Sequence, residues 1–134
     1  MAFLIGAATA LAAAAFAAAS GFDRSRAFYP TVLFVIASYY VLFAVMGGAP
    51  GVLGPELALF GLFAAAAVLA FRWNLWLAVL ALAAHGVLDL GHAALIRNPG
   101  TPAWWPPFCM AYDLCAAACL SVIILRRERP LQPQ

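Results

Sequence analysis

The chain has 134 residues, of which 67% are hydrophobic and only 9% are charged. Soluble domains carry roughly 25% charged residues, so this composition excludes an ordinary soluble fold and indicates an integral membrane protein. The net charge of +2 is small and the seven basic residues are dispersed along the chain, which argues against nucleic acid binding.

Apolar runs divide the chain into five predicted helices. In chain order they cover residues 2–20, 31–47, 56–71, 75–95 and 108–125. A membrane span needs about 20 apolar residues, so the chain has room for five spans and short loops within one domain, residues 1–134. No basic segment precedes the first run, so we expect a retained helix rather than a signal peptide. Four spans, without the first or third helix as a full crossing, is the alternative.

Arginine placement predicts the orientation, because basic residues in short loops stay on the cytoplasmic side. With five spans, one side carries Arg24, Arg26, Arg72, Arg126, Arg127 and Arg129, and the other carries only Arg97. The all-α bundle is therefore expected to have its N-terminus outside and its C-terminus in the cytoplasm. A multi-pass protein of a bacterial inner (cytoplasmic) membrane fits this pattern.

Ionisable residues interrupt the fourth predicted helix. His85, Asp89 and His92 are spaced i, i+4 and i+7, so they fall within an arc of about 60° on one helical face. Asp113, about a turn and a half into the fifth helix, is expected at the depth of Asp89. Glu56 begins the third helix on the same, outer side. The sequence thus predicts a polar cluster in the outer half of the membrane.

An Asp at the centre of a membrane helix costs roughly 2.5 to 3.5 kcal/mol, so such residues face protein and commonly mark function. Imidazole and carboxylate groups suit zinc or iron, which makes His85, Asp89, His92 and Asp113 the predicted metal ligands. Glu56 and Asp113 are the candidate catalytic residues. The structural alternative is a set of hydrogen bonds between helices, worth about 0.6 kcal/mol each on average.

Aromatic residues and one cysteine are predicted near this cluster. Trp104 and Trp105 suit either an aromatic belt at the membrane interface or a stiff lid over the site. With Cys109 and Tyr39, they are the candidate substrate-lining residues, and Tyr40 is expected to be buried with its hydroxyl satisfied. All three cysteines lie in or beside the last predicted span, and we expect small core residues rather than a disulfide framework.

Two segments carry a resemblance to a known group. His-x3-Asp-x2-His at residues 85–92, with Trp-Trp-Pro-Pro-Phe-Cys-x3-Asp at residues 104–113, resembles a group of small bacterial multi-span membrane proteins that has no established activity. The resemblance implies that the two segments belong to one unit. A looser likeness is to the membrane hydrolase superfamily that includes alkaline ceramidases, which hold zinc with His residues beside an Asp and a Ser. This chain has two His rather than three and five predicted spans rather than seven.

Three functions follow from these patterns. The first is a metal-dependent enzyme, such as a hydrolase, acting on a lipid-like substrate from the outer leaflet. The alternative is a non-catalytic subunit, or a protein that binds a small ligand or pigment, within a larger membrane complex. The expected partners are membrane lipid and either further copies of the chain or the other subunits of such a complex. The third is an ion or proton transporter, although only Asn74 continues the polar face below His85. The sequence does not decide between enzyme and accessory protein.

Overall fold

The computed structural model describes residues 1–128, which fold into five long helices and one short 3-10 helix. The elements are α1 (Ala2–Ser20), η1 (Phe22–Arg24), α2 (Phe28–Gly47), α3 (Leu53–Arg72), α4 (Trp76–Leu95) and α5 (Trp105–Glu128). Each of the five long helices is long and apolar enough to cross a membrane. This includes α1 and α3, the two helices that a four-span arrangement would exclude as full crossings.

Several helices begin before the residue that the sequence predicted. α2 begins at Phe28 rather than at residue 31, α3 at Leu53 rather than at residue 56, and α5 at Trp105 rather than at residue 108. In each case the first helical turn contains proline, which in the sequence favours a loop. Proline is tolerated in the first helical turn, where backbone N–H groups have no partner within the helix.

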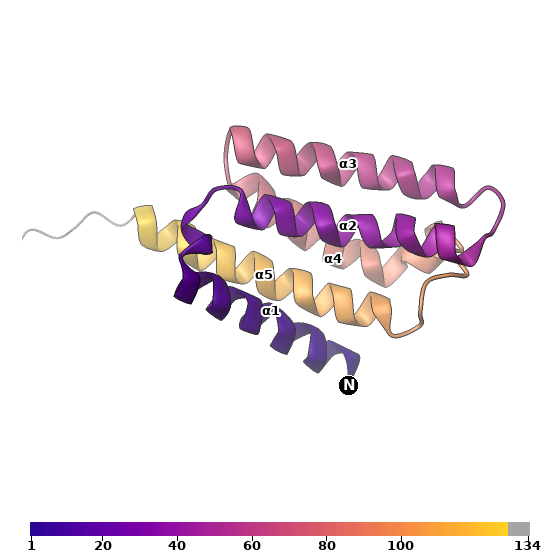
Figure 1. Cartoon of the computed structure of the whole chain (residues 1–134), viewed down its shortest axis with the longest axis horizontal. Helices are drawn as coiled ribbons and strands as arrows, with labels where there is room; N and C mark the ends of the chain where they lie inside the picture. The colour runs from indigo at the N-terminus through magenta and orange to yellow at the C-terminus, as the bar shows by residue number, and fades with distance from the viewer. Residues whose placement is uncertain (129–134) are drawn as a thin grey trace, which may run out of the picture.

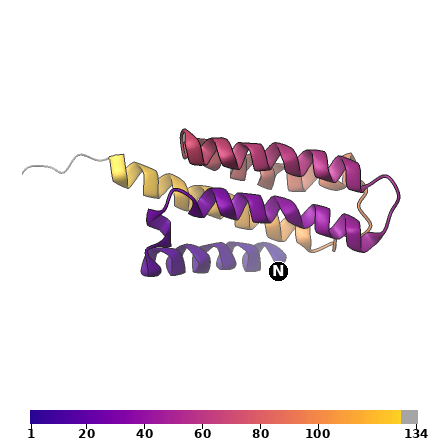
Figure 2. The same cartoon turned by 45° about the horizontal axis from the view of Figure 1, so that its top comes forward.

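Four of the helices form an antiparallel bundle, and α1 lies outside it (Figure 1). Around the bundle, α2 packs on α3, α3 on α4, and α4 on α5, whereas α2 and α5 make few contacts with each other. α1 packs against α5 and η1 (Figure 2). A Cβ atom at Gly6 would overlap the carbonyl oxygen of Phe108, so this glycine permits the close approach of α1 to α5.

The outer surface of the bundle is apolar. Large hydrophobic side chains are exposed on all five long helices, including Leu4, Leu42, Leu62, Leu90 and Val122. Such a surface is typical of helices that face lipid. Of the arginines used to predict orientation, Arg26 and Arg127 border one hollow at the end of the bundle where α2 begins and α5 ends. Arg129 lies outside the described residues.

The bundle interior has two different halves. Toward the end where α5 terminates, buried alanines and leucines fill the space, among them Ala78, Leu82, Ala117 and Leu120. Toward the other end lie five buried ionisable side chains, from α3, α4 and α5. These are Glu56, His85, Asp89, His92 and Asp113.

Candidate functional site

The predicted polar face of α4 points into the bundle. His85, Asp89 and His92 are each no more than 2% exposed, as expected for ionisable residues within a membrane span. Ala78 and Ala81 continue this buried face toward the start of α4. Asn74 does not continue it, because it is exposed before the helix and accepts a hydrogen bond from the backbone N–H of Trp76.

Four of the buried side chains form a compact group. Each side chain offers one atom that could bind a metal, and these four atoms lie within 4.8 Å of one another. The residues are His85, Asp89, Cys109 and Asp113. His85 Nδ1 lies 2.7 Å from Asp113 Oδ2 and 3.8 Å from Asp89 Oδ2, and Cys109 Sγ is 3.8 Å from Asp113 Oδ2. The prediction that Asp113 lies at the depth of Asp89 is therefore confirmed, and the group could hold a metal ion.

His92 lies outside this group of four. Its Nε2 atom is 3.2 Å from Glu56 Oε2 on α3, and Asn98 Nδ2 donates to the other carboxylate oxygen of Glu56 at 2.8 Å. The physical reason is distance along α4, because His85 and His92 are separated by a rise of about 10 Å. One ion with bonds of about 2.0 to 2.3 Å would require both imidazoles to bend toward each other.

Tyr40 on α2 joins the two polar groups. Its hydroxyl donates a hydrogen bond of 2.6 Å to Asp89 Oδ1, which fulfils the expectation of a satisfied hydroxyl. Its ring stacks on the imidazole of His92, with centroids 3.8 Å apart and an interplanar angle of 18°. Asn98 also donates to the backbone carbonyl of Tyr40 at 3.0 Å. The network therefore ties together α2, α3, α4 and the segment before α5.

Small residues hold α4 and α5 together at the site. A Cβ atom at Gly86 would lie 3.1 Å from the Cβ of Asp113 and 3.2 Å from the carbonyl oxygen of Met110. These distances are tighter than nearly all real Cβ contacts. Gly86 therefore permits the helix approach that places His85 beside Asp113.

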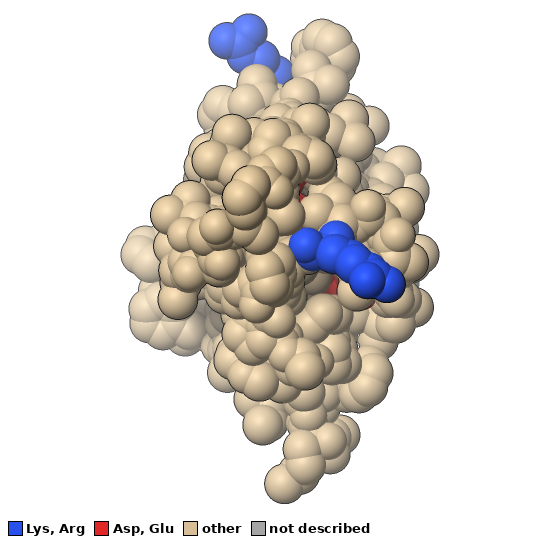
Figure 3. Space-filling view, turned by 90° about the vertical axis from the view of Figure 1, so that its right-hand side faces the viewer, with Lys and Arg blue, Asp and Glu red and all other residues tan. Residues whose placement is uncertain are grey.

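Two carboxylate oxygens in the group of four have no hydrogen-bond partner among the described residues. They are Asp89 Oδ2 and Asp113 Oδ1, and both are inaccessible to solvent. An unpaired buried carboxylate oxygen is unfavourable unless a proton or cation is close to it. Figure 3 views the end of the bundle where residues 96–104 lie, and acidic atoms are visible there only within small recesses.

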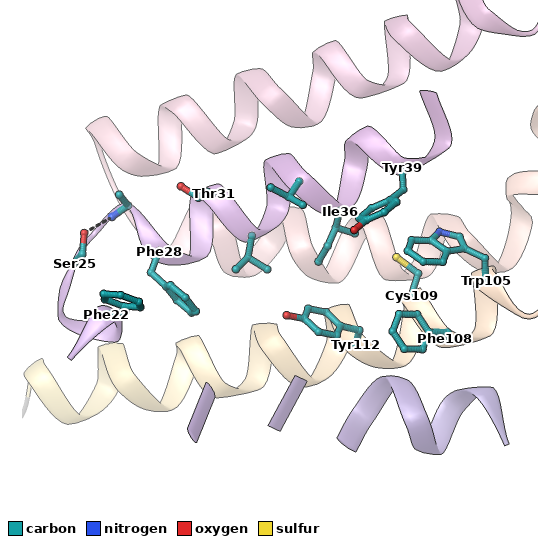
Figure 4. A pocket seen from close by; sticks show the side chains of 13 residues that line it. Phe22, Ser25, Phe28, Thr31, Ile36, Tyr39, Trp105, Phe108, Cys109 and Tyr112 are labelled. Atoms are coloured by element: carbon teal, nitrogen blue, oxygen red, sulfur yellow. Dashed lines mark hydrogen bonds between the residues drawn. The ribbon is translucent and has the colours of Figure 1, made fainter. Parts of the chain in front are cut away.

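An apolar groove reaches the site from the side, between α2 and α5 (Figure 4). It has a volume of about 560 Å³ and is lined mainly by apolar side chains. Tyr39, Trp105 and Cys109 gather at one end of it, so three of the four predicted substrate-lining residues line one groove. Trp104 does not line it, and its side chain is 56% exposed.

Two features of the site were not predicted from the sequence. Cys109 joins the group of possible metal ligands, whereas the sequence placed it only on the substrate surface. The second is Asn98, whose side-chain amide donates to both the Glu56 carboxylate and the Tyr40 backbone carbonyl. In the sequence, Asn98 is a single amide residue in a loop, and Asn in loops commonly bonds to nearby backbone. The sequence therefore does not indicate its contacts with distant residues.

Comparison of the chain with protein-family models, with curated proteins and with solved structures finds no match. Inference about function therefore depends on the geometry of the site.

Proposed function

We propose that this protein is a membrane-embedded, metal-dependent hydrolase that acts on a lipid-like substrate. The observation that carries the proposal is the pair of buried, unpartnered carboxylate oxygens of Asp89 and Asp113, beside His85 and Cys109. A bound cation would balance the charge of both carboxylates and coordinate these two oxygens. No donor among the described residues forms a hydrogen bond with either oxygen.

The donor set favours a metal that accepts nitrogen, oxygen and sulfur. Imidazole, carboxylate and thiolate together suit zinc or iron better than magnesium or calcium, which prefer oxygen ligands. We assign His85, Asp89 and Asp113 as the three ligands and leave the fourth position, beside Cys109, open to water or substrate. Three protein ligands with one open position is the arrangement of catalytic zinc sites, and Cys109 borders the groove from which a substrate would arrive.

Such an ion would polarise a carbonyl group and acidify water beside it. The protein residues around it would orient the ligands. Tyr40 donates to Asp89 and thereby leaves one defined carboxylate oxygen free for the ion. Glu56, predicted as a general base, bonds instead to His92 and Asn98, so in this proposal it positions the ring of His92 against Tyr40.

The excess of arginine at one end supports an N-terminus outside and a C-terminus in the cytoplasm of a bacterial inner membrane. In this orientation the site lies in the outer half of the bilayer. A transporter fits less well, because the core between His85 and the arginine-rich end is built from residues such as Ala81, Leu82 and Leu120. In the described part of the chain, no buried carboxylate or imidazole continues a proton path through that half; its buried hydroxyl, that of Tyr29, has no hydrogen-bond partner among the described residues.

Elemental analysis of protein purified in mild detergent, without a metal-affinity step, tests the metal site. We expect about one zinc or iron per chain, because the described part of the chain has one group of ligands that could hold an ion. The double variant His85→Leu with Asp113→Ala should fold and lose the metal, since it removes two ligands together and leaves neither partner unpaired.

His92→Gln is the matched control, because it changes the neighbouring histidine and keeps a hydrogen-bond donor for Glu56. It should retain the metal, and so should Cys115→Ala on α5. Wild-type protein without stoichiometric metal would contradict the proposal. Loss of metal in His92→Gln would contradict the assigned ligands. Mass spectrometry of lipids incubated with the metal-loaded protein in nanodiscs then separates a hydrolase, which releases products, from a binding protein.

A further inference from the structure

We infer that the groove between α2 and α5 binds one acyl chain of a membrane lipid, with the carbonyl end of that chain at Cys109. The inference rests on the proposed function and specifies its substrate class as acyl lipids of the surrounding bilayer. A groove on a membrane protein is in contact with lipid, and its occupant here must be apolar along most of its length.

The shape of the groove fits a single chain. Its lining runs along α2 from Phe28 to Tyr39, which corresponds to a length of about 16 Å. The hydrocarbon core of a bilayer is about 30 Å thick, so the groove, measured from the start of α2, extends over about half of that thickness. The volume of about 560 Å³ is within the usual range of ligand pockets, roughly 300 to 1,000 Å³.

The two ends of the groove differ in chemistry. Phe22 and Phe28 close the end near η1, and Ile36 and Tyr112 face the groove between the ends (Figure 4). Among residues 1–128, no charged side chain lines it. A hydrocarbon tail would therefore lie along α2 toward η1, without a partner for any charged headgroup at that end.

The other end supplies the polar contacts that an acyl carbonyl requires. The indole nitrogen of Trp105 is buried and has no hydrogen-bond partner among the described residues, although the side chain is packed against Tyr39 with ring centroids 4.7 Å apart. A buried N–H without an acceptor is unfavourable, and rotation of the indole toward the groove would let a lipid carbonyl accept its hydrogen bond. Cys109 beside it also belongs to the group of four, so the same carbonyl would lie next to the site.

Photo-crosslinking tests this inference. Phosphatidylcholine with a diazirine in the middle of one acyl chain would be incorporated into nanodiscs with the full-length protein, and crosslinked residues mapped by mass spectrometry. We expect crosslinks concentrated on the groove-lining residues of α2 and α5. Val35→Trp, at the rim of the groove, should reduce them roughly tenfold, because displacing two buried methylene groups suffices for that loss.

Val45→Trp is the matched control, since it places the same side chain on the same helix away from the groove. Val35 and Val45 are 45% and 62% exposed, so both variants should fold. Val32→Trp, deeper in the groove, provides a second blocking variant. Crosslinks spread evenly over α1 and α3 as well, or equal labelling in the Val35 and Val45 variants, would overturn the inference.

Metal content measured on the same samples separates this inference from the proposed function. Groove labelling in a protein without metal would support the lipid site and contradict the metal-dependent hydrolase. Stoichiometric metal without groove labelling would support the metal site and contradict the lipid site.

Discussion

The two sides of α5 are packed in different ways. Toward α4, a glycine and small side chains bring the helices close enough for His85 to reach Asp113. Toward α2, aromatic side chains such as Trp105 and Tyr112 keep the helices apart and leave a groove. Cys109 belongs to both sides, because it borders the groove and lies within the group of four.

The difference separates two requirements of a site within a membrane. Ligands must be held in a fixed geometry, which a closely packed helix pair provides. A lipid-like substrate must also reach them laterally, which requires an opening between helices. One helix meets both requirements here because its small and aromatic residues occupy different faces.

The largest expected effect comes from breaking the pair that crosses the closely packed side. His85→Leu alone leaves Asp113 buried without its partner, which should destabilise the fold by about 3 to 5 kcal/mol. Adding Asp113→Ala should recover most of that loss, because both polar partners are then absent. Unfolding in mixed micelles with increasing SDS measures both variants. A double variant as unstable as the single one would show that the pair is required for folding itself.

A smaller effect is expected from widening the same helix pair. Gly86→Leu forces a side chain against Asp113 and Met110, and overpacking of this kind costs about 1 to 3 kcal/mol. Gly91→Leu on the same helix is the control, because a Cβ atom there meets nothing within 4 Å. The same unfolding assay compares the two. Equal stability of the two variants would contradict close packing at Gly86.

The smallest effect concerns the contact that fixes α2 to α4. Tyr40→Phe removes the hydroxyl that donates to Asp89 and keeps the ring that stacks on His92. Hydrogen bonds between membrane helices are worth about 0.6 to 1.7 kcal/mol, so we expect a loss in that range. Tyr39→Phe should change stability less, because no hydrogen bond of its hydroxyl is found in the described part of the chain. A larger loss of stability in Tyr39→Phe than in Tyr40→Phe would contradict the importance of the Tyr40 hydrogen bond.

The sequence predicted those parts of the fold and site that depend on local periodicity. Apolar run length identified five helices, and the spacing of His85, Asp89 and His92 placed all three on one buried face. Counting residues along the last two predicted helices placed Asp113 at the depth of Asp89, because every helix rises by the same distance per residue.

The remaining features depend on how helices are rotated and spaced relative to one another. Periodicity does not reveal that His92 faces Glu56 on α3 while His85 faces α5. The ligand set predicted from the sequence therefore included His92 and lacked Cys109. The groove exists because α2 and α5 make few contacts with each other, and periodicity does not reveal which pair of helices is separated. Asn98 lies in an irregular segment whose path is set by its contacts with α2 and α3.

The polar network also has an order in time, because a chain is synthesised from its N-terminus. Tyr40 and Glu56 precede α4 in the chain, so partners for Asp89 and His92 leave the ribosome before α4 does. The partner of His85 is made later, because Asp113 follows a loop and about two turns of α5, which begins at Trp105. The candidate metal site can therefore be completed only after α5 has been synthesised.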